Sequence, residues 1–157
     1  MGRLEDKTAI VTGAAQGTGE VIARLFAEEG ASVVLGDVKA DAGRAVAEEI
    51  GDRARFVQLD VTREDDWRAA VEATREAFGD VDVLVNNAAI LLLAPLDETS
   101  REDFLRIVEV NQLGPFLGIQ AVLPSMKARG GGSIVNIAST DGIKGMNGVA
   151  AYASSKW

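Results

Sequence analysis

The stretch "TAIVTGAAQGTGE", residues 8–20, decides the fold. It opens with five apolar or β-branched residues typical of a buried strand and continues into three glycines, Gly13, Gly17 and Gly19. Glycines between a strand and a helix leave backbone N–H groups bare, and those groups, together with the helix dipole, can hold a pyrophosphate. The stretch therefore predicts a strand, a phosphate-binding turn and a helix.

The same alternation of strand and helix continues along the chain. Further short apolar runs occupy residues 32–37, 55–60, 81–86 and 133–139. Segments of helical period lie between the runs, at residues 17–29, 40–50, 63–78 and 100–128, and the last is expected to hold two helices. Strands that are apolar throughout and alternate with helices predict an α/β domain with a parallel sheet covered on both faces. Because no linker or repeat interrupts the pattern, residues 1–157 are expected to form a single domain.

Several of these helices carry capping signals at their ends. Thr62 with Asp65, and Ser100 with Asp103, fit N-caps followed by an acid three residues later. Three glycines fall where helices should end: Gly30, Gly51 and Gly79.

Composition excludes several classes of function. The chain has 157 residues, a net charge of −8, and neither cysteine nor histidine. The acidic balance argues against nucleic-acid binding, and the missing residues exclude disulfides, Cys/His zinc sites, thiol nucleophiles and imidazole bases. No metal site is expected, and acid–base chemistry would have to use carboxylates, lysine or tyrosine. No apolar run approaches a membrane span, and the N-terminus lacks the pattern of a signal peptide, so a cytoplasmic location is expected.

The acid at the end of the second apolar run bears on the choice of nucleotide. Asp37 stands where a carboxylate can accept hydrogen bonds from an adenosine ribose and would repel a 2′-phosphate. This position favours NAD over NADP, although the nearby Lys39 can soften the preference. A solvated acid at a strand end is the alternative interpretation of Asp37.

The final residues, "AYASSKW", place Tyr152 and Lys156 one helical turn apart on the same helix face. Together with "TGAAQGTG", "LDVT", "LVNNAA" and "GGGSIVNIAS", in this order, the stretch "YASSK" resembles the classical short-chain dehydrogenase/reductase (SDR) family. The resemblance runs from about residue 5 to the last residue. It implies a Rossmann-like, doubly wound sheet with strand order 3-2-1-4-5, without the last two strands of the family.

The resemblance also implies an NAD(H) site, and it carries over residue by residue. The glycines and Asp37 match the family's dinucleotide-binding residues, Asp60 matches a contact to the adenine amino group, and Asn87 and Ala88 match a loop against the cofactor. An acid near the start of a helix is the alternative for Asp60. The full cofactor set implied is Gly13, Gln16, Gly17, Thr18, Gly19, Asp37, Asp60, Val61, Asn87, Ala88, Tyr152 and Lys156.

Four residues match the family's catalytic tetrad: Asn111, Ser139, Tyr152 and Lys156. A free phenol is a poor base at neutral pH, but a lysine ammonium one turn away and the positive ring of NAD⁺ both favour the phenolate. Tyr152 would then be the general acid/base and Lys156 its electrostatic partner. Ser139 would donate a hydrogen bond to the substrate oxygen, and Asn111 would anchor a water that relays protons towards Lys156.

The sequence departs from the family pattern in three places. Thr18 replaces an aliphatic residue between the last two glycines, and Ala89 replaces a glycine, at a cost of about 1 kcal/mol if that backbone needs positive φ. Family members also continue beyond the catalytic lysine. The terminal helix is therefore expected to fray without docking, residues 133–139 to form an unguarded edge strand, and the 157 residues alone to turn over little or nothing.

The expected reaction is the interconversion of a secondary alcohol and a ketone. The segments "ILLLAPLDE" and "IKGMNGVA" supply apolar groups, and the similarity is closest to bacterial 3α/20β-hydroxysteroid dehydrogenases, so the small-molecule substrate is expected to be steroid-like. The alternatives are a 3-oxoacyl-carrier-protein reductase and an inactive, truncated dinucleotide-binding or scaffold module. The family further implies a homodimer or homotetramer for a full-length chain.

Overall fold

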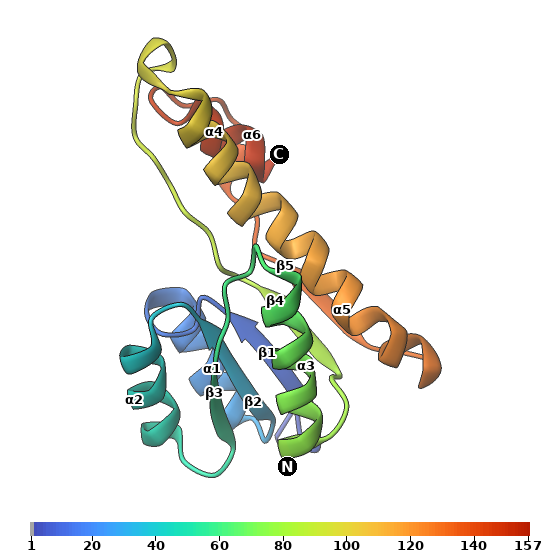
Figure 1. Ribbon diagram of the computed structural model, residues 1–157. Helices are drawn as coiled ribbons and strands as arrows, with labels where there is room; N and C mark the ends of the chain where they lie inside the picture. Colours follow the sequence, from blue (N-terminus) through green and yellow to red (C-terminus); the bar gives the residue numbers. More distant parts are fainter. Residues whose placement is uncertain (1) are drawn as a thin grey trace.

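Five parallel strands form one sheet in the order β3-β2-β1-β4-β5 in the computed structural model, which describes residues 2–157 (Figure 1). The strands are β1 Thr8–Thr12, β2 Ser32–Asp37, β3 Ala54–Gln58, β4 Val83–Asn86 and β5 Ser133–Asn136. The predicted strand order is confirmed. Because the order reverses between β1 and β4, the carboxyl ends of these two strands mark the place where open α/β sheets bind ligands.

Helices cover both faces of this sheet. They are α1 Gly17–Glu28, α2 Ala40–Ile50, α3 Glu64–Phe78, α4 Arg101–Val108, α5 Gly114–Ala128 and α6 Ala150–Lys156. A π-helical segment, Glu109–Leu113, joins α4 to α5, and two short 3₁₀ turns lie at Leu96–Glu98 and Thr140–Gly142. Within residues 2–157, no helix is both long enough and apolar enough to cross a membrane.

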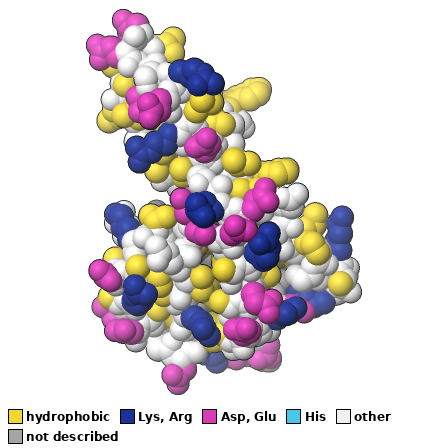
Figure 2. Space-filling view, viewed as in Figure 1, with side chains coloured by type: hydrophobic (Ala, Val, Ile, Leu, Met, Phe, Trp, Pro, Cys, Tyr) yellow, Lys and Arg dark blue, Asp and Glu magenta, His cyan; other side chains and the backbone are white. Residues whose placement is uncertain are grey.

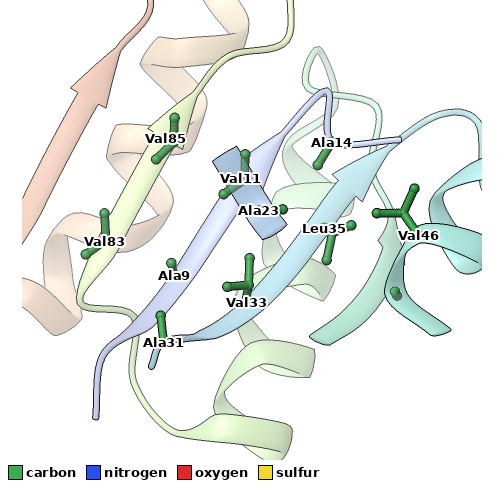
Figure 3. Close-up of a cluster of buried hydrophobic side chains, with 11 residues drawn as sticks. Ala9, Val11, Ala14, Ala23, Ala31, Val33, Leu35, Val46, Val83 and Val85 are labelled. Carbon is green, nitrogen blue, oxygen red and sulfur yellow. The ribbon is translucent and has the colours of Figure 1, made fainter. Parts of the chain in front are cut away.

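The alternation of side chains along each strand builds two cores. On one face, side chains of β1, β2 and β4 such as Val11, Leu35 and Val85 pack with Ala23 of α1 and Val46 of α2 (Figure 3). On the opposite face, residues such as Ile10, Val34 and Leu84 pack with residues of α3 and α5, and Trp67 is 1% exposed there. Burial on both faces explains why these strands are apolar throughout.

The helix-end predictions are partly confirmed. Ser100 caps α4, since its hydroxyl accepts a hydrogen bond from Asp103 N at 3.0 Å, and Gly30, Gly51 and Gly79 all have positive φ after helices. The cap predicted at Thr62 is wrong. Its hydroxyl and its N–H both donate to Asp60 Oδ1, at 2.8 and 3.0 Å. The N-cap of α3 is Arg63, and the helix begins at Glu64. A local side-chain hydrogen bond therefore displaces the cap.

Some predicted boundaries also shift. The strand expected over 55–60 ends at Gln58. Leu59 N still donates to Asp37 O at 3.0 Å, but Asp60 N turns away to Asp66. The strand expected over 133–139 ends at Asn136. The segment 100–128 does contain two helices, but the π-helical segment connects them without a break in the helical path.

A lobe projects from the sheet at the carboxyl ends of the strands (Figures 1 and 2). It contains α4 and α6, which pack against each other, and α6 also packs against the π-helical segment. These contacts provide the docking that a helix of seven residues needs. At the edge of the sheet, β5 pairs with β4 alone within the described residues.

Candidate active site

A cavity of about 700 Å³ lies at the carboxyl edge of the sheet. The glycine turn, the residues that follow β2, β3 and β4, and one side of α4 with the π-helical segment line it. Nine of the predicted cofactor residues contribute to this lining: Gly13, Gln16, Gly17, Thr18, Asp37, Asp60, Val61, Asn87 and Ala88. Gly19, Tyr152 and Lys156 are not among the residues that line it.

The glycine turn needs glycine for two different reasons. Gly17 has φ +58°, a conformation that side chains rarely adopt, and a Cβ built there would meet no heavy atom within 4 Å. Gly19 is buried, and a Cβ there would collide with the carbonyl of Gly13 and lie 2.6 Å from the side-chain nitrogen of Asn87. Gly17 therefore opens the turn, whereas Gly19 lets α1 approach the loop after β4.

The start of α1 is free to receive an anion. Gln16 occupies the N-cap position with extended backbone, and its side chain makes no capping hydrogen bond. The first N–H groups of the helix lack a side-chain partner, and the open space beside Gly17 adjoins them. A pyrophosphate fits this combination of uncapped N–H groups, helix dipole and missing side chain.

Thr12, which the sequence analysis did not single out, holds the loop after β4 against the turn. Its hydroxyl oxygen accepts hydrogen bonds from Asn87 N and Ala88 N, both at 3.0 Å, and Thr12 is 1% exposed. In the other direction, the side-chain amide of Asn87 donates to Thr12 O at 2.9 Å. Only the fold reveals this role, because the partners are 75 and 76 residues apart in sequence.

Asp37 is buried at the end of β2 and lines the cavity. Its carboxylate accepts hydrogen bonds from Ala15 N at 3.0 Å and from Lys39 N at 2.9 Å. The ammonium of Lys39 donates to Gln16 Oε1 at 2.7 Å, and both residues line the cavity. The acid therefore stands in the predicted place, with one exposed cation beside it.

The structure removes the expected penalty at Ala89. Asp6, with φ 60°, is the only non-glycine residue of positive φ among residues 2–157, so Ala89 adopts an ordinary backbone conformation. Alanine is accommodated there without strain.

The cavity also has lining residues that the sequence analysis did not name, including Val38, Ile90, Arg106 and Val110. Helical period alone did not reveal which side of residues 100–128 would face it.

Asn111 joins three segments through its buried side chain. Its Oδ1 accepts a hydrogen bond from Ile90 N at 2.9 Å, and its Nδ2 donates to Ile90 O and to Ser155 Oγ, each at 2.9 Å. Both amide N–H groups are thereby used within the protein. The residue lies in the π-helical segment, a type of irregularity that often marks functional sites.

Lys156 reaches from α6 to the chain segment that follows β5. Its Nζ donates to Ile137 O at 2.7 Å, two residues before Ser139, and burial lowers the pKa of the Lys156 ammonium below its ordinary value. Ser139 Oγ accepts a hydrogen bond from Asp141 N at 3.1 Å, and Tyr152 is partly buried on α6. In residues 2–157, no hydrogen bond links the side chains of Ser139, Tyr152 and Lys156 to one another.

The four predicted tetrad residues thus come from the segment after β5, the π-helical segment and α6. Asn111 is connected directly to α6 through Ser155, and Lys156 to the segment that carries Ser139. The phenol and the ammonium are thus both carried by α6, and neither lines the cavity.

Comparison with known proteins agrees with this architecture. The family model for short chain dehydrogenases matches residues 7–157. A 3-alpha-(or 20-beta)-hydroxysteroid dehydrogenase of Mycobacterium tuberculosis (strain ATCC 25618 / H37Rv) is 45% identical over 156 residues, covering 99% of this chain and 60% of the relative.

Two further relatives act, by name, on ring compounds. A trans-4-hydroxycyclohexanecarboxylate dehydrogenase of Sinomonas cyclohexanicum is 44% identical over 164 residues, covering 99% of this chain and 63% of the relative. A cyclopentanol dehydrogenase of Comamonas testosteroni is 43% identical over 159 residues, covering 99% and 64%. The chain spans between 60% and 64% of the length of these three relatives. With the match to the family model over residues 7–157, the protein is shown to belong to the short-chain dehydrogenase family.

Proposed function

We propose that the protein is an NAD(H)-dependent oxidoreductase that interconverts a secondary alcohol and a ketone. The observation that carries the proposal is the cavity at the carboxyl edge of the sheet, where an uncapped helix, an open glycine turn and the buried Asp37 meet. Residues 1–157 would be the dinucleotide-binding part of this oxidoreductase.

The residues of the glycine turn would hold the pyrophosphate, and those after β2 and β3 the adenosine. When bound, the nicotinamide supplies or receives the hydride. The chain itself must then manage the proton at the substrate oxygen. Tyr152 would give this proton during reduction and take it during oxidation, with the charge of Lys156 favouring the phenolate. Ser139 would donate a hydrogen bond to the same oxygen and stabilise the charge that develops on it.

Asn111 would contribute to catalysis indirectly, by supporting the helix α6 that carries Tyr152 and Lys156. Since both of its side-chain N–H groups are engaged with Ile90 and Ser155, it has none left to donate to a water or a substrate. A relay water near Asn111 would therefore have to donate a hydrogen bond to an oxygen atom of the protein.

NAD is the cofactor that Asp37 favours. The 2′-phosphate of NADP would approach the buried carboxylate of Asp37. Like charges repel strongly where water is excluded. Lys39 lies at the same rim and would partly offset this repulsion.

An apolar alicyclic alcohol or ketone is the substrate class that we propose, extending to steroids. Leu91, Leu93 and Leu96 in the segment after β4, and Ile143 and Met146 before α6, are all exposed. Exposed apolar side chains on two segments near the tetrad suit a ring compound without charge. The names of the three relatives agree on a ring compound, although the cyclohexanecarboxylate of one of them carries a charge.

Turnover and binding together test this proposal. The chain is extended by the C-terminal portion that its relatives have beyond the matched region, because the 157 residues alone are expected to turn over little. This extended protein is mixed with NAD⁺ and cyclopentanol, NADH formation is followed, and NADH binding is measured separately by fluorescence titration. The variant Tyr152→Phe is expected to bind NADH within about twofold of wild type but to lose turnover by roughly 100-fold or more. Unchanged turnover in this variant would contradict the role of Tyr152. NADH binding without turnover in the wild type would identify a dinucleotide-binding module instead.

A further inference from the structure

We infer that Ser155 is a positioning residue that ties the helix carrying Tyr152 and Lys156 to the loop beside the nucleotide cavity. The inference rests on the proposed function, because it assigns Ser155 a part in arranging the acid–base residues. Ser155 itself does not line the cavity.

The loop after β4 provides the first part of the connection. Ala88, Ala89 and Ile90 line the cavity, and Ile90 is held to Asn111 through both its N–H and its carbonyl oxygen. Because two hydrogen bonds join the side chain of Asn111 to the backbone of Ile90, they fix the orientation of the amide group as well as its distance from Ile90. The amide plane of Asn111 is therefore set by a residue of the cavity wall.

Ser155 provides the second part. Asn111 Nδ2 donates to Ser155 Oγ at 2.9 Å, and the Ser155 hydroxyl in turn donates to Tyr152 O at 2.7 Å. Asn111 is 5% exposed and Ser155 7% exposed, so water cannot readily replace either bond. An unbroken chain of hydrogen bonds runs from the cavity wall to the backbone of the residue that carries the phenol.

The length of α6 makes this connection important. A helix of seven residues is not stable by its own hydrogen bonds, so its contacts with the π-helical segment and α4 determine whether its residues keep their places. Removal of the Ser155 hydroxyl would leave a buried N–H of Asn111 without its acceptor. We expect α6 to loosen while the sheet and the cavity remain intact.

Ser154 is a closely matched control. It lies next to Ser155 on the same helix, and its hydroxyl also donates to a carbonyl three residues earlier, Ala151 O, at 2.8 Å. Its side chain is exposed and does not contact Asn111. The two serines therefore have the same chemistry and local bonding but differ in the connection to the cavity wall.

Amide hydrogen exchange, with and without NADH, tests the connection directly. In the wild type, NADH is expected to slow exchange in α6. In Ser155→Ala, the α6 amides are expected to exchange roughly tenfold faster and to lose most of the NADH protection, whereas amides of β1 and α1 stay unchanged. Ser154→Ala is expected to resemble the wild type. Equal effects of the two substitutions, or faster exchange throughout the sheet, would overturn the inference.

Kinetics of the same extended protein with NAD⁺ and cyclopentanol separate positioning from general stability. Ser155→Ala is expected to lower kcat by roughly tenfold and to leave the NADH dissociation constant within about twofold of wild type. Ser155→Thr keeps the hydroxyl and should recover part of kcat. In an Asn111→Ala background, Ser155→Ala should have little further effect, because the connection is already broken. Additive losses would contradict the inference.

If the wild type fails to bind NADH, the proposed function fails. The exchange rates of α6 in the two serine variants without nucleotide would still decide whether Ser155 holds this helix.

Discussion

At the residue scale, Thr12 shows how one buried hydroxyl can fix the wall of the cavity. Replacement by valine keeps the shape of the side chain but leaves Asn87 N and Ala88 N without their acceptor. We expect the free energy of unfolding to fall by about 1–3 kcal/mol, because Thr12 is buried whereas Asn87 and Ala88 are only partly buried.

Urea unfolding followed by circular dichroism measures this loss. Thr12→Ser, which retains the hydroxyl, is the control and should lose much less stability. The prediction fails if the serine and valine variants are equally destabilised, since the loss would then come from packing of the methyl group.

We predict that Lys39 weakens the proposed rejection of a 2′-phosphate. Its ammonium is at the cavity rim close to Gln16, and Asp37 supplies the opposing negative charge. Lys39→Met is expected to weaken NADPH binding by roughly fivefold, since an exposed ion pair contributes up to about 1 kcal/mol, and to leave NADH binding nearly unchanged.

Fluorescence titration with the two nucleotides measures the ratio of their dissociation constants. Lys127→Met is the control, because Lys127 is an exposed lysine in the last turn of α5 and does not line the cavity. An equal loss of NADH and NADPH affinity in Lys39→Met would show that the lysine supports binding generally and has no part in selecting the nucleotide.

The cavity-lining residues that could be predicted from sequence are those whose role depends on local spacing. The glycines and Asp37 follow strands and precede or face a helix start, so their place in the fold is set by a few neighbouring residues. Thr12 and Ser155 could not be recognised, because their partners, Asn87 and Asn111, are far away in the sequence. Local pattern contains no information about those contacts.

At the scale of the element, apolar runs predicted which segments become strands but not where each strand ends. A strand ends where its neighbour stops offering hydrogen bonds, and this depends on register between segments. Asp60 illustrates the point, since its N–H donates to Asp66 in α3 rather than continuing the ladder of β3. The cap at Thr62 failed for a different, local reason, because its hydroxyl donates to Asp60 instead of accepting from the first turn of α3.

The helix α6 should respond to pH through Lys156. Burial lowers the folded-state pKa of Lys156 below the ordinary value of 10.5, so the charged form destabilises the docked helix. As the pH rises from that lowered value towards 10.5, the unfolded state binds more protons than the folded state, and stability increases. The free energy of unfolding is therefore expected to rise across this alkaline window.

The effect is isolated by comparing chains with and without Lys156. Urea unfolding is measured at several pH values from neutral to alkaline. The chain with Lys156 should gain stability relative to Lys156→Met as the pH rises. Lys144→Met, at an exposed position, makes the same change in net charge and is the control. A difference that falls with pH would contradict the expected sign.

At the scale of the whole molecule, the layers around the sheet are unequal. The strands β1, β2 and β4 are buried between helices, whereas β5 has no partner on its outer side within the described residues. Val135 of β5 is 41% exposed, and apolar side chains also lie at the surface of the projecting lobe and near its junction with the body (Figure 2). An apolar edge strand of this kind can pair with another chain through its free N–H and carbonyl groups.

We therefore expect the chain of 157 residues to associate through β5, and a charge at this edge to weaken the association. Val135→Lys should shift the weight-average mass towards the monomer in sedimentation experiments over a range of concentrations. Val21→Lys, which places the same charge on an exposed valine of α1, keeps the change in net charge but leaves the edge untouched. If both substitutions disperse the protein equally, general charge repulsion explains the result. If only Val135→Lys does so, the association runs through the free edge of the sheet.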